Sequence, residues 1–389
     1  MKIFVIARGY PSKQEPTWGC FEKDQAEALS QLGHQVVILS VDTRFRFYWR
    51  KIGVNIVEKG GIRAYNMFLI PYALLFFLPA GIKDRLFAWQ MDRIYQRAVA
   101  IHGTPDILYS HYLRCTQMAV HLRNKYHIPL VGIEHWSTLN IRPIPNNIRC
   151  MVNKTYPQVD QLLAVSEPLK RNIEEFNAPL KRRIQVVHNM VGKEFDYTPK
   201  TNHTSSLKIV STGRLVYGKG FDLLIDALHN IKDQLPEHWQ AIIIGGGKQK
   251  ERLQQQINAY SLQAHILLAG PKNKAEIVQM LQESDMFVFP SRGENFSVAV
   301  LEALACGLPV VASICGGIRE CIHESNGLLF PVDDVDALSA AILQMANNKS
   351  HYDRQAITDD CQAHFAPQVI AQQLTTIFEN TIKATKSVQ

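Results

Sequence analysis

The chain lacks the cysteine patterns that staple secreted domains or bind structural zinc. Its cysteines are odd in number and include no Cys-x-x-Cys pair; the seven stand at positions 20, 115, 150, 306, 315, 321 and 361. A disulfide framework is therefore not expected, and a reducing compartment fits. Cys315, Cys321 and His323 come nearest to a metal cluster, but they lack the paired spacing of zinc ligands. No metal site is predicted.

Long hydrophobic runs are also missing. The apolar N-terminus, residues 1–7, is too short for a signal peptide and leads directly into Arg8, so a strand is expected and no export signal. The longest apolar run, residues 67–82, falls short of the ~20 residues that span a bilayer and is interrupted by Pro71 and Pro79. We therefore expect a cytoplasmic protein that does not cross a membrane by this run.

Acidic residues are scarce in the first half of the chain. Residues 1–200 hold 27 Lys and Arg against 16 Asp and Glu, whereas the remainder holds 15 against 19. A basic half indicates an anionic partner, either lipid headgroups or nucleic acid. No helix-turn-helix, zinc-finger or aromatic RNA-binding signature accompanies the charge, so a nucleic-acid partner is not predicted.

Short β-branched runs alternate with helical patterns along the whole chain. One such helical pattern is Phe87, Met91, Ile94 and Ala98. Alternation of this kind predicts parallel sheets covered by helices on both faces. The expected strands are 3–7, 36–41, 107–111, 130–135, 162–166, 184–188, 209–213, 241–245, 266–270, 286–290 and 310–313.

A polar stretch after residue 190 separates two series of strands and predicts two doubly wound α/β domains. The expected limits are an N-terminal domain at 1–190, a linker at 191–206, a second domain at 207–365 and a closing helix at 366–389. Ligands bind at the carboxyl ends of strands in this architecture, so the cleft between the domains is the expected site.

Residues 290–313, PSRGENFSVAVLEALACGLPVVAS, carry the strongest local signal. A helix is expected from about Ser297 to Cys306, ended by Gly307 and Pro309. Glu302 is the one polar residue among apolar neighbours, so it is either a buried carboxylate that ribose hydroxyls could satisfy or a residue on a partly exposed face. Glu294 lies in the loop that feeds the helix, whose first N–H groups suit an anion.

Residues 211–228, STGRLVYGKGFDLLIDAL, form a second cluster. Arg214 and Lys219 flank a loop with glycines at 213, 218 and 220, where the backbone could approach a diphosphate. Two solvated surface cations are the alternative.

Together these residues resemble the retaining GT-B glycosyltransferases of family 4, also called glycosyl transferases group 1. The resemblance is carried by T-G-R-L-x-x-x-K-G, P-S-x-x-E and E-x7-E followed by A-L-A-C-G-x-P-V-V-A. It continues in G-G-I-x-E-x-I and N-G-L-L-F, and in the first half in D-I-L-Y-S-H and E-H-W-S. It spans nearly the whole chain, although residues 42–100 match weakly.

The resemblance implies a GT-B fold, two Rossmann-like domains, and roles for individual residues. Arg214 and Lys219 would neutralise the donor diphosphate in place of a metal, Glu294 would contact the sugar hydroxyls and Glu302 the ribose. The loop and helix start would cap the phosphates through Asn295, Phe296, Ser297 and Val298.

Three further positions follow from the resemblance. Gly19 would belong to a glycine loop of the first domain that meets the donor, and Gly270 would lie beside the nucleobase. His135 would approach the sugar, whereas a lone histidine at a strand end is more often structural. The catalytic residues implied are His135 and Glu294. No cofactor is implied beyond the nucleotide-sugar co-substrate.

The chain departs from the family pattern in two places. The family writes E-G-F-G where this chain has Glu294 to Ser297. Asn295 tolerates a positive φ and could keep the loop shape, and Ser297 could cap the helix. Trp18 and Cys20 flank Gly19 where many relatives have two glycines. The Asp-Val-Asp at 334–336 precedes a helical pattern and is expected to be an N-cap rather than a metal ligand.

The implied reaction is transfer of a sugar with retention to a glycan or lipid-linked glycan, in bacterial cell-surface polysaccharide or glycolipid synthesis, from a UDP- or GDP-sugar. A nucleotide-sugar 2-epimerase and a catalytically silent nucleotide-sugar-binding subunit are the alternatives. The basic first domain, residues 44–50 (RFRFYWR) and run 67–82 suggest peripheral contact with the anionic inner face of a membrane. A buried helix or lid at 67–82 is the competing interpretation.

Overall fold

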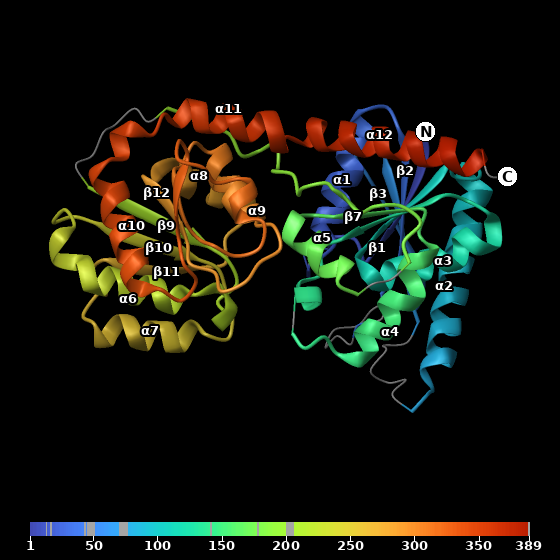
Figure 1. The fold of residues 1–389 in the computed structure, drawn as a ribbon, viewed down its shortest axis with the longest axis horizontal. Helices are drawn as coiled ribbons and strands as arrows, with labels where there is room; N and C mark the ends of the chain where they lie inside the picture. Colours follow the sequence, from blue (N-terminus) through green and yellow to red (C-terminus); the bar gives the residue numbers. More distant parts are fainter. Residues whose placement is uncertain are drawn as a thin grey trace. The chain divides into compact units, whose positions relative to one another are not determined.

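The computed structural model of the chain describes residues 1–12, 14–15, 18–42, 44, 51–69, 77–140, 142–176, 179–199 and 206–387. The chain divides into unit 1, formed by residues 1–188 and 367–389, and unit 2, formed by residues 189–366. Each unit is an α/β body with its own sheet (Figure 1). The predicted class, two doubly wound α/β domains of the GT-B type, is confirmed.

Unit 1 is built on a sheet whose described strands run in the order β3-β4-β2-β1-β5-β6-β7-β8. These strands are β1 Lys2–Ala7, β2 Gln35–Val41, β3 Gly53–Lys59, β4 Ile62–Phe68, β5 Ile107–His111, β6 Leu130–Glu134, β7 Gln161–Ala164 and β8 Gln185–Val186. Its α-helices are α1 Cys20–Gln31, α2 Ala80–His102, α3 Tyr112–Tyr126, α4 Asn146–Thr155, α5 Glu167–Glu174 and α12 Pro367–Lys386. The strand order reverses direction between the neighbours β1 and β5, and ligands bind outside the carboxyl ends of the strands at such a point.

An antiparallel hairpin at the edge of this sheet corrects the prediction of parallel sheets throughout. Strands β3 and β4 pair antiparallel across Gly60 and Gly61, which have φ angles of 60° and 78°. A two-residue hairpin turn of this kind needs positive φ at both central positions. The Gly-Gly pair was therefore the sequence signal for these two strands, which the prediction missed.

The last helix, α12, packs against α1 of unit 1 (Figure 1). Ile370 and Leu374, one helical turn apart in it, are both buried. The ring of Phe378 lies 5.0 Å from that of Tyr109 on β5. The end of the chain thus completes the core of the unit in which the chain begins.

Unit 2 has a fully parallel sheet in its described residues, in the order β11-β10-β9-β12-β13-β14. Its strands are β9 Lys208–Thr212, β10 Gln240–Ile244, β11 Ile266–Gly270, β12 Met286–Phe289, β13 Val310–Ser313 and β14 Gly327–Phe330. Its α-helices are α6 Phe221–Ile231, α7 Lys250–Ala259, α8 Lys274–Glu283, α9 Val298–Ala305, α10 Val335–Asn347 and α11 Arg354–Phe365. In chain order the strands read 3-2-1-4-5-6, so the switch point lies between β9 and β12.

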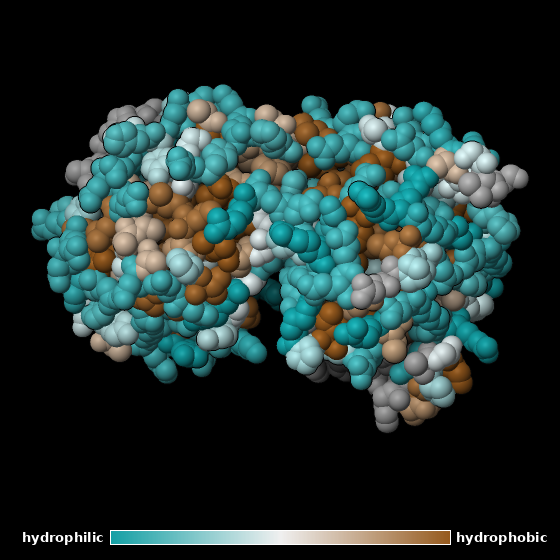
Figure 2. All heavy atoms as spheres, viewed as in Figure 1, coloured by the Kyte–Doolittle hydropathy of each residue, from teal (hydrophilic) through white to brown (hydrophobic). Residues whose placement is uncertain are grey.

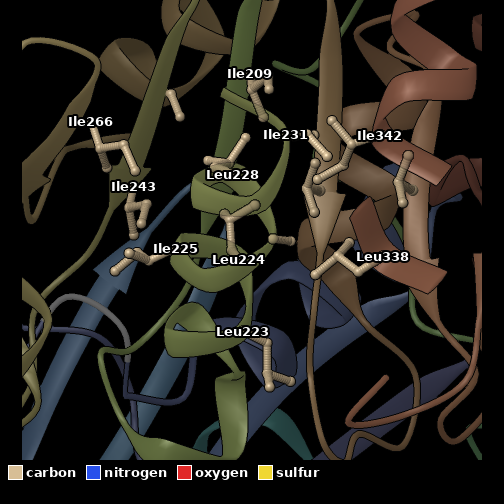
Figure 3. Close-up of a cluster of buried hydrophobic side chains, with 14 of the residues drawn as sticks. Ile209, Leu223, Leu224, Ile225, Leu228, Ile231, Ile243, Ile266, Leu338 and Ile342 are labelled. Carbon is tan, nitrogen blue, oxygen red and sulfur yellow. The ribbon is translucent and has the colours of Figure 1, made fainter. Parts of the chain in front are cut away.

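The core of unit 2 lies between the sheet and helices α6 and α10 (Figure 3). Leu224 and Leu228 of α6 meet Ile243 of β10, and Leu338 and Ile342 pack beside them from α10; none of these five side chains is exposed to solvent. Burial of each such side chain contributes roughly 1.5–3 kcal/mol. This packing fixes where the loop between β9 and α6 can lie.

Among the described residues, no helix combines the length and hydrophobicity needed to cross a bilayer. The segments on which the membrane hypothesis was first based fall largely outside the described residues, namely 45–50 within RFRFYWR and 70–76 within the run 67–82.

Candidate functional site

The two motifs of unit 2 leave neighbouring strands at its switch point. The loop 213–220 follows β9 and the loop 290–297 follows β12, and these strands are paired in parallel. The carboxyl ends of parallel neighbours meet at one edge of the sheet. The residues that the sequence singled out 75 positions apart, Lys219 and Glu294, are thereby brought together.

The two loops are joined by hydrogen bonds to the backbone carbonyl of Gly218. Ser291 donates its hydroxyl to the carbonyl of Gly218 at 3.0 Å, and the N–H of Arg292 donates to the same oxygen at 2.9 Å. Gly220 has φ 67°, and a Cβ there would overlap the carbonyl oxygen of Pro290. Glycine at 220 is required by this close approach of the two loops.

Arg292, which the sequence analysis did not single out, locks this junction. Its guanidinium donates to both carboxylate oxygens of Asp222 at 2.8 and 2.9 Å, and to Asp333 at 2.6 Å. It also lies 3.9 Å from the ring centroid of Tyr217. The bonds to Asp222 outweigh burial and raise the pKa of Arg292. A paired planar contact of this kind fixes geometry as well as charge.

Lys219 and Glu294 form an ion pair across the two loops. Their side chains keep 20% and 24% of their surface exposed, so both remain accessible at the edge of the sheet. The other carboxylate oxygen of Glu294 accepts from the N–H of Asn295 at 3.2 Å. Arg214 is exposed, and its side chain has no hydrogen bond or ion pair within the part of the chain that the structure describes.

The backbone of the segment from Glu294 to Ser297 is held by two hydrogen bonds from other parts of unit 2. The N–H of Gly317 donates to the carbonyl of Asn295 at 2.8 Å, and the side-chain amide of Asn189 donates to the carbonyl of Phe296 at 2.9 Å. Gly316, with φ 53°, leaves no room for a Cβ beside the carbonyl of Glu294. This close approach explains why a glycine stands at 316.

Three local predictions at this segment need correction. Asn295 is not among the described residues with positive φ, so the left-handed tolerance of asparagine does not explain its presence. Ser297 occupies the N-cap position of α9, but its side chain makes no capping hydrogen bond. Glu302 is partly exposed rather than buried, which agrees with the alternative considered for it.

The remaining predicted positions of unit 2 lie outside the two loops 213–220 and 290–297. Gly270 ends β11 with φ 71° and open space where a Cβ would lie, and its carbonyl accepts from Gly245. Asp334 caps α10 by accepting from the N–H of Ala337 at 2.8 Å, so the N-cap interpretation is confirmed. Val298 begins α9 and is partly exposed.

In unit 1, polar and aromatic residues gather at the carboxyl ends of β1, β5 and β6. Arg8 follows β1, and its guanidinium pairs at 2.8 Å with the fully buried Glu22. Burial lowers the pKa of Arg8, but the hydrogen bonds and charge of Glu22, with smaller contributions from Tyr112 and Cys115, more than offset it and leave the pKa raised. The same guanidinium lies 3.7 Å from the ring centroid of Tyr112, the residue after β5.

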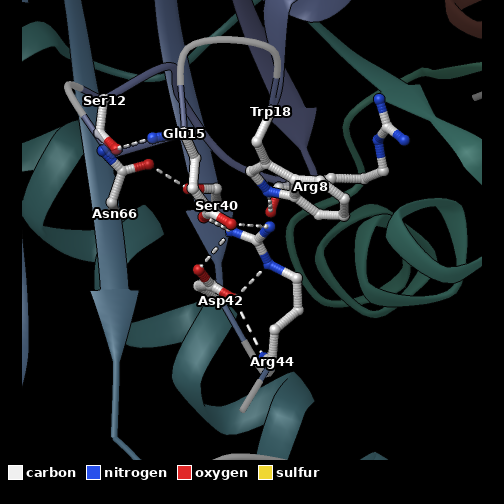
Figure 4. A network of polar contacts seen from close by, with 8 residues as sticks. All are labelled: Arg8, Ser12, Glu15, Trp18, Ser40, Asp42, Arg44 and Asn66. Carbon is white, nitrogen blue, oxygen red and sulfur yellow. Dashed lines mark hydrogen bonds and ion pairs between the residues drawn. The ribbon is translucent and has the colours of Figure 1, made fainter. Parts of the chain in front are cut away.

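The described part of the loop between β1 and α1 is anchored on Trp18 (Figure 4). The indole N–H of Trp18 donates to the carbonyl of Arg8 at 3.1 Å, and the guanidinium of Arg44 lies 3.5 Å from the ring. Arg44 in turn pairs with Asp42 at 2.8 Å and with Glu15 at 2.9 Å. This chain therefore has an aromatic anchor directly before Gly19.

Gly19 begins α1 from the N-cap position with φ 77°. A Cβ at this position would overlap the carbonyl oxygen of Gly9. The glycine is thus required by contact within the loop, independently of any ligand.

His135 is held by a buried carboxylate that the sequence analysis passed over. Glu134, which is 1% exposed, accepts from the hydroxyl of Tyr156 at 2.7 Å and from the N–H groups of His135 and Trp136 at 2.9 and 2.7 Å. Burial raises the pKa of Glu134, and these bonds partly offset the rise. The turn that presents His135 is therefore fixed by its neighbour in the E-H-W-S motif.

Comparisons with known proteins agree with the motifs. An uncharacterized glycosyltransferase of Methanocaldococcus jannaschii is 30% identical over 63% of this chain and 66% of its own length. The putative colanic acid biosynthesis glycosyltransferase WcaL of Escherichia coli is 25% identical over 72% of each chain. Anabaena HepE, solved in complex with UDP-glucose, matches 97% of this chain and 99% of its own with TM-score 0.72 and 19% identity, which shows the shared fold.

Two family models cover adjoining parts of the sequence. The model described as Glycosyltransferase Family 4 matches residues 23–195, and that described as Glycosyl transferases group 1 matches residues 194–358. Together they include every described strand except β1, and all the motifs after residue 22. The chain belongs to the family 4, group 1 glycosyltransferases and is a retaining nucleotide-sugar transferase of GT-B fold.

Proposed function

We propose that this enzyme transfers a hexosyl group from a UDP- or GDP-sugar to a glycan or lipid-linked glycan in bacterial cell-surface polysaccharide or glycolipid synthesis. The observation that carries the proposal is the switch point of unit 2, where Arg214, Lys219 and Glu294 lie on two mutually bonded loops. The polysaccharide assignment is supported by the likeness to WcaL, and a uridine donor by the likeness to HepE.

Within this proposal the two cations hold the donor diphosphate and make the reaction independent of a metal ion. Lys219 is bonded to Glu294, so an incoming diphosphate competes for its ammonium group. That competition frees a carboxylate oxygen of Glu294 for the sugar hydroxyls. Arg214 adds a second positive charge, Glu302 binds the ribose, and the backbone at 296–298 caps the phosphates.

The reaction proposed is attack on the face from which the diphosphate leaves. The acceptor oxygen bonds to the anomeric carbon while the bond from that carbon to the phosphate oxygen breaks. The proton of the acceptor hydroxyl passes to the departing phosphate oxygen, so no protein nucleophile is needed. The protein contributes orientation and stabilisation of the leaving charge.

The proposal divides the work between the predicted domains. Residues 207–365 bind the donor, with Gly270 near the nucleobase, and residues 1–190 bind the acceptor, joined by the linker 191–206. Gly19 and His135 of the first domain serve the reacting sugar. Residues 366–389 close the fold of the first domain, and the protein works in the cytoplasm.

The test is release of nucleotide from UDP-, GDP- and ADP-sugars, each with and without extracted bacterial glycolipid. Release from one donor that depends on lipid and falls at least about 100-fold in Glu294→Ala would support the proposal. Glu283→Ala is the matched control, because Glu283 precedes β12 and lies at the opposite end of that strand. Equal activity of the two variants would refute the role of Glu294. Nucleotide binding without turnover would favour a silent subunit.

Peripheral contact with an anionic membrane forms part of the proposal. Ile82, Arg85, Trp89 and Arg93 lie at spacings of three and four on α2, and all are exposed. Such spacing places them on one face of the helix. A few hydrophobic side chains are also seen around the N-terminal end of α2 (Figure 2). Mixed aromatic and cationic faces suit anionic lipid headgroups.

Co-sedimentation with phosphatidylglycerol vesicles at low salt tests this contact. Trp89→Ser should weaken binding at least about 10-fold. The control is Ile101→Ser, because Ile101 is at least as exposed as Trp89 but lies on another face of α2. If neither variant loses binding, or if both lose it equally, this face of α2 is not the membrane contact.

A further inference from the structure

His111, the last residue of β5, is a buried histidine to which the proposed reaction assigns no role. It has no exposed surface, and its Nδ1 lies 3.3 Å from Nε2 of His135. The two rings are parallel within 3°, with centroids 5.4 Å apart. A hydrogen bond between the rings therefore links the ends of β5 and β6.

The environment of His111 decides which of its nitrogens carries a proton. Burial, followed by the charge of Arg8, lowers the pKa of His111 to about 3, so the ring is neutral with one proton. Its Nε2 is buried and has no hydrogen-bond partner among the described residues. A proton on Nε2 would bury a donor with no acceptor, which is rarer in proteins than an unpaired acceptor. The proton therefore belongs on Nδ1, from which it is donated to His135.

The hydrogen bond that His135 accepts fixes the tautomer of its ring. Its Nε2 must present a lone pair, so the neutral ring carries its own proton on Nδ1. The ring is also held by Tyr112, whose ring centroid lies 5.0 Å away. Tyr112 has φ 63°, a strained conformation for a tyrosine that the surrounding structure must impose.

We propose that His111 is a positioning residue, which holds His135 in the Nδ1–H tautomer and so makes Nδ1 a hydrogen-bond donor to an oxygen of the sugar. This rests on the proposed role of His135 in the transfer. The backbone of His135 is set by Glu134, and its ring by His111 and Tyr112. Partners that orient metal-bound histidines in this way contribute roughly 10–100-fold to activity, and we expect an effect of the same order at His135.

The direct test is the tautomer of His135 in the full chain, read from the ring-nitrogen signals of ¹⁵N-histidine-labelled protein. The chain has 14 histidines, so the signals are assigned by comparison with His135→Gln. We expect a protonated Nδ1 and an unprotonated Nε2 in the wild type. His111→Asn, whose amide can donate from the position of Nδ1, should keep this pattern, and His111→Leu should lose it.

Kinetics supply the second readout. His111→Leu should lower kcat about 10–100-fold with little change in the KM for donor, and His111→Asn should recover most of the loss. The control is His102→Leu, which removes another histidine of unit 1, one bonded to Tyr65 at 3.1 Å. It should leave the His135 signals unchanged.

The spectra separate this inference from the proposed function, because they need neither donor nor acceptor. A wild-type His135 protonated on Nε2 would overturn the inference even if no His111 variant folds. An unchanged tautomer in a folded His111→Leu protein would do the same. The expected tautomers in a protein that turns over no nucleotide-sugar would instead overturn the proposed function alone.

Discussion

Substitution of Gly316 by alanine should damage both the stability of unit 2 and the proposed donor site. Gly316 has φ 53°, and a Cβ at this position would lie 2.8 Å from the carbonyl carbon of Glu294 and 2.8 Å from the carbonyl oxygen of Asn295. Both distances are shorter than the 3.0 Å that real Cβ atoms keep. The segment that carries Glu294 must therefore move.

The loss of stability expected for Gly316→Ala has two parts. An alanine in the left-handed region costs about 1–2 kcal/mol. Overpacking against a backbone that is hydrogen-bonded on its other side adds about 1–3 kcal/mol. The free energy of unfolding should therefore fall by about 2–5 kcal/mol, and a displacement of Glu294 near 1 Å should lower kcat/KM about 100-fold.

Gly33→Ala is the matched control for the cost of an alanine in the left-handed region. Gly33 follows α1 with φ 85°, and no atom lies within 4 Å of the place where its Cβ would be. It should lose only about 1–2 kcal/mol and keep its activity. Thermal unfolding and initial rates on the same preparations measure both effects. If Gly316→Ala is no less stable than Gly33→Ala and equally active, the close approach deduced for residues 294 and 316 is wrong.

Three other substitutions test separate parts of the structure. Arg292→Lys keeps the charge but not the paired bonds to Asp222, so urea unfolding should show a loss of about 1–2 kcal/mol. Asp334→Ala removes a helix cap and should cost about 1 kcal/mol without changing the metal dependence of activity in a chelator titration. Burial lowers the pKa of His111 to about 3. Between that pH and about 6.5, the usual pKa of histidine, the unfolded chain binds a proton that the folded chain does not. The free energy of unfolding therefore falls as the pH falls through this window. His111→Leu should reduce this slope in Tm measured from pH 4 to 7, and an unchanged slope would assign the acid sensitivity to other groups.

The positions of the two motifs of unit 2 could be predicted from the sequence because each lies where an apolar strand gives way to glycine and polar residues. β9 and β12 are buried on both faces and are easily recognised. The reversal of strand order between them then brings Lys219 to Glu294. Local pattern and a general rule of topology were enough for this part.

The supporting residues could not be predicted in the same way. Arg292 is explained by Asp222, 70 positions earlier, and Glu134 by Tyr156, 22 positions later. The sequence places His111 at the end of a strand. Nothing in that motif, D-I-L-Y-S-H at residues 106–111, distinguishes a buried imidazole from an exposed one. Such pairings depend on which loops meet above the sheet, and a single sequence does not contain that information.

The glycines of the loop 213–220 show how structure separates two physical causes that a sequence pattern combines. The spacing at 213, 218 and 220 predicted room for a diphosphate, but Gly220 is already required by its contact with Pro290. Gly218 is different, because it has no positive φ and no atom lies within 4 Å of the place where its Cβ would be. The described fold would accept a side chain at 218, so the fold itself does not explain the glycine. A ligand that approaches the backbone does explain it, which makes Gly218 the glycine of this loop that best supports the proposed diphosphate.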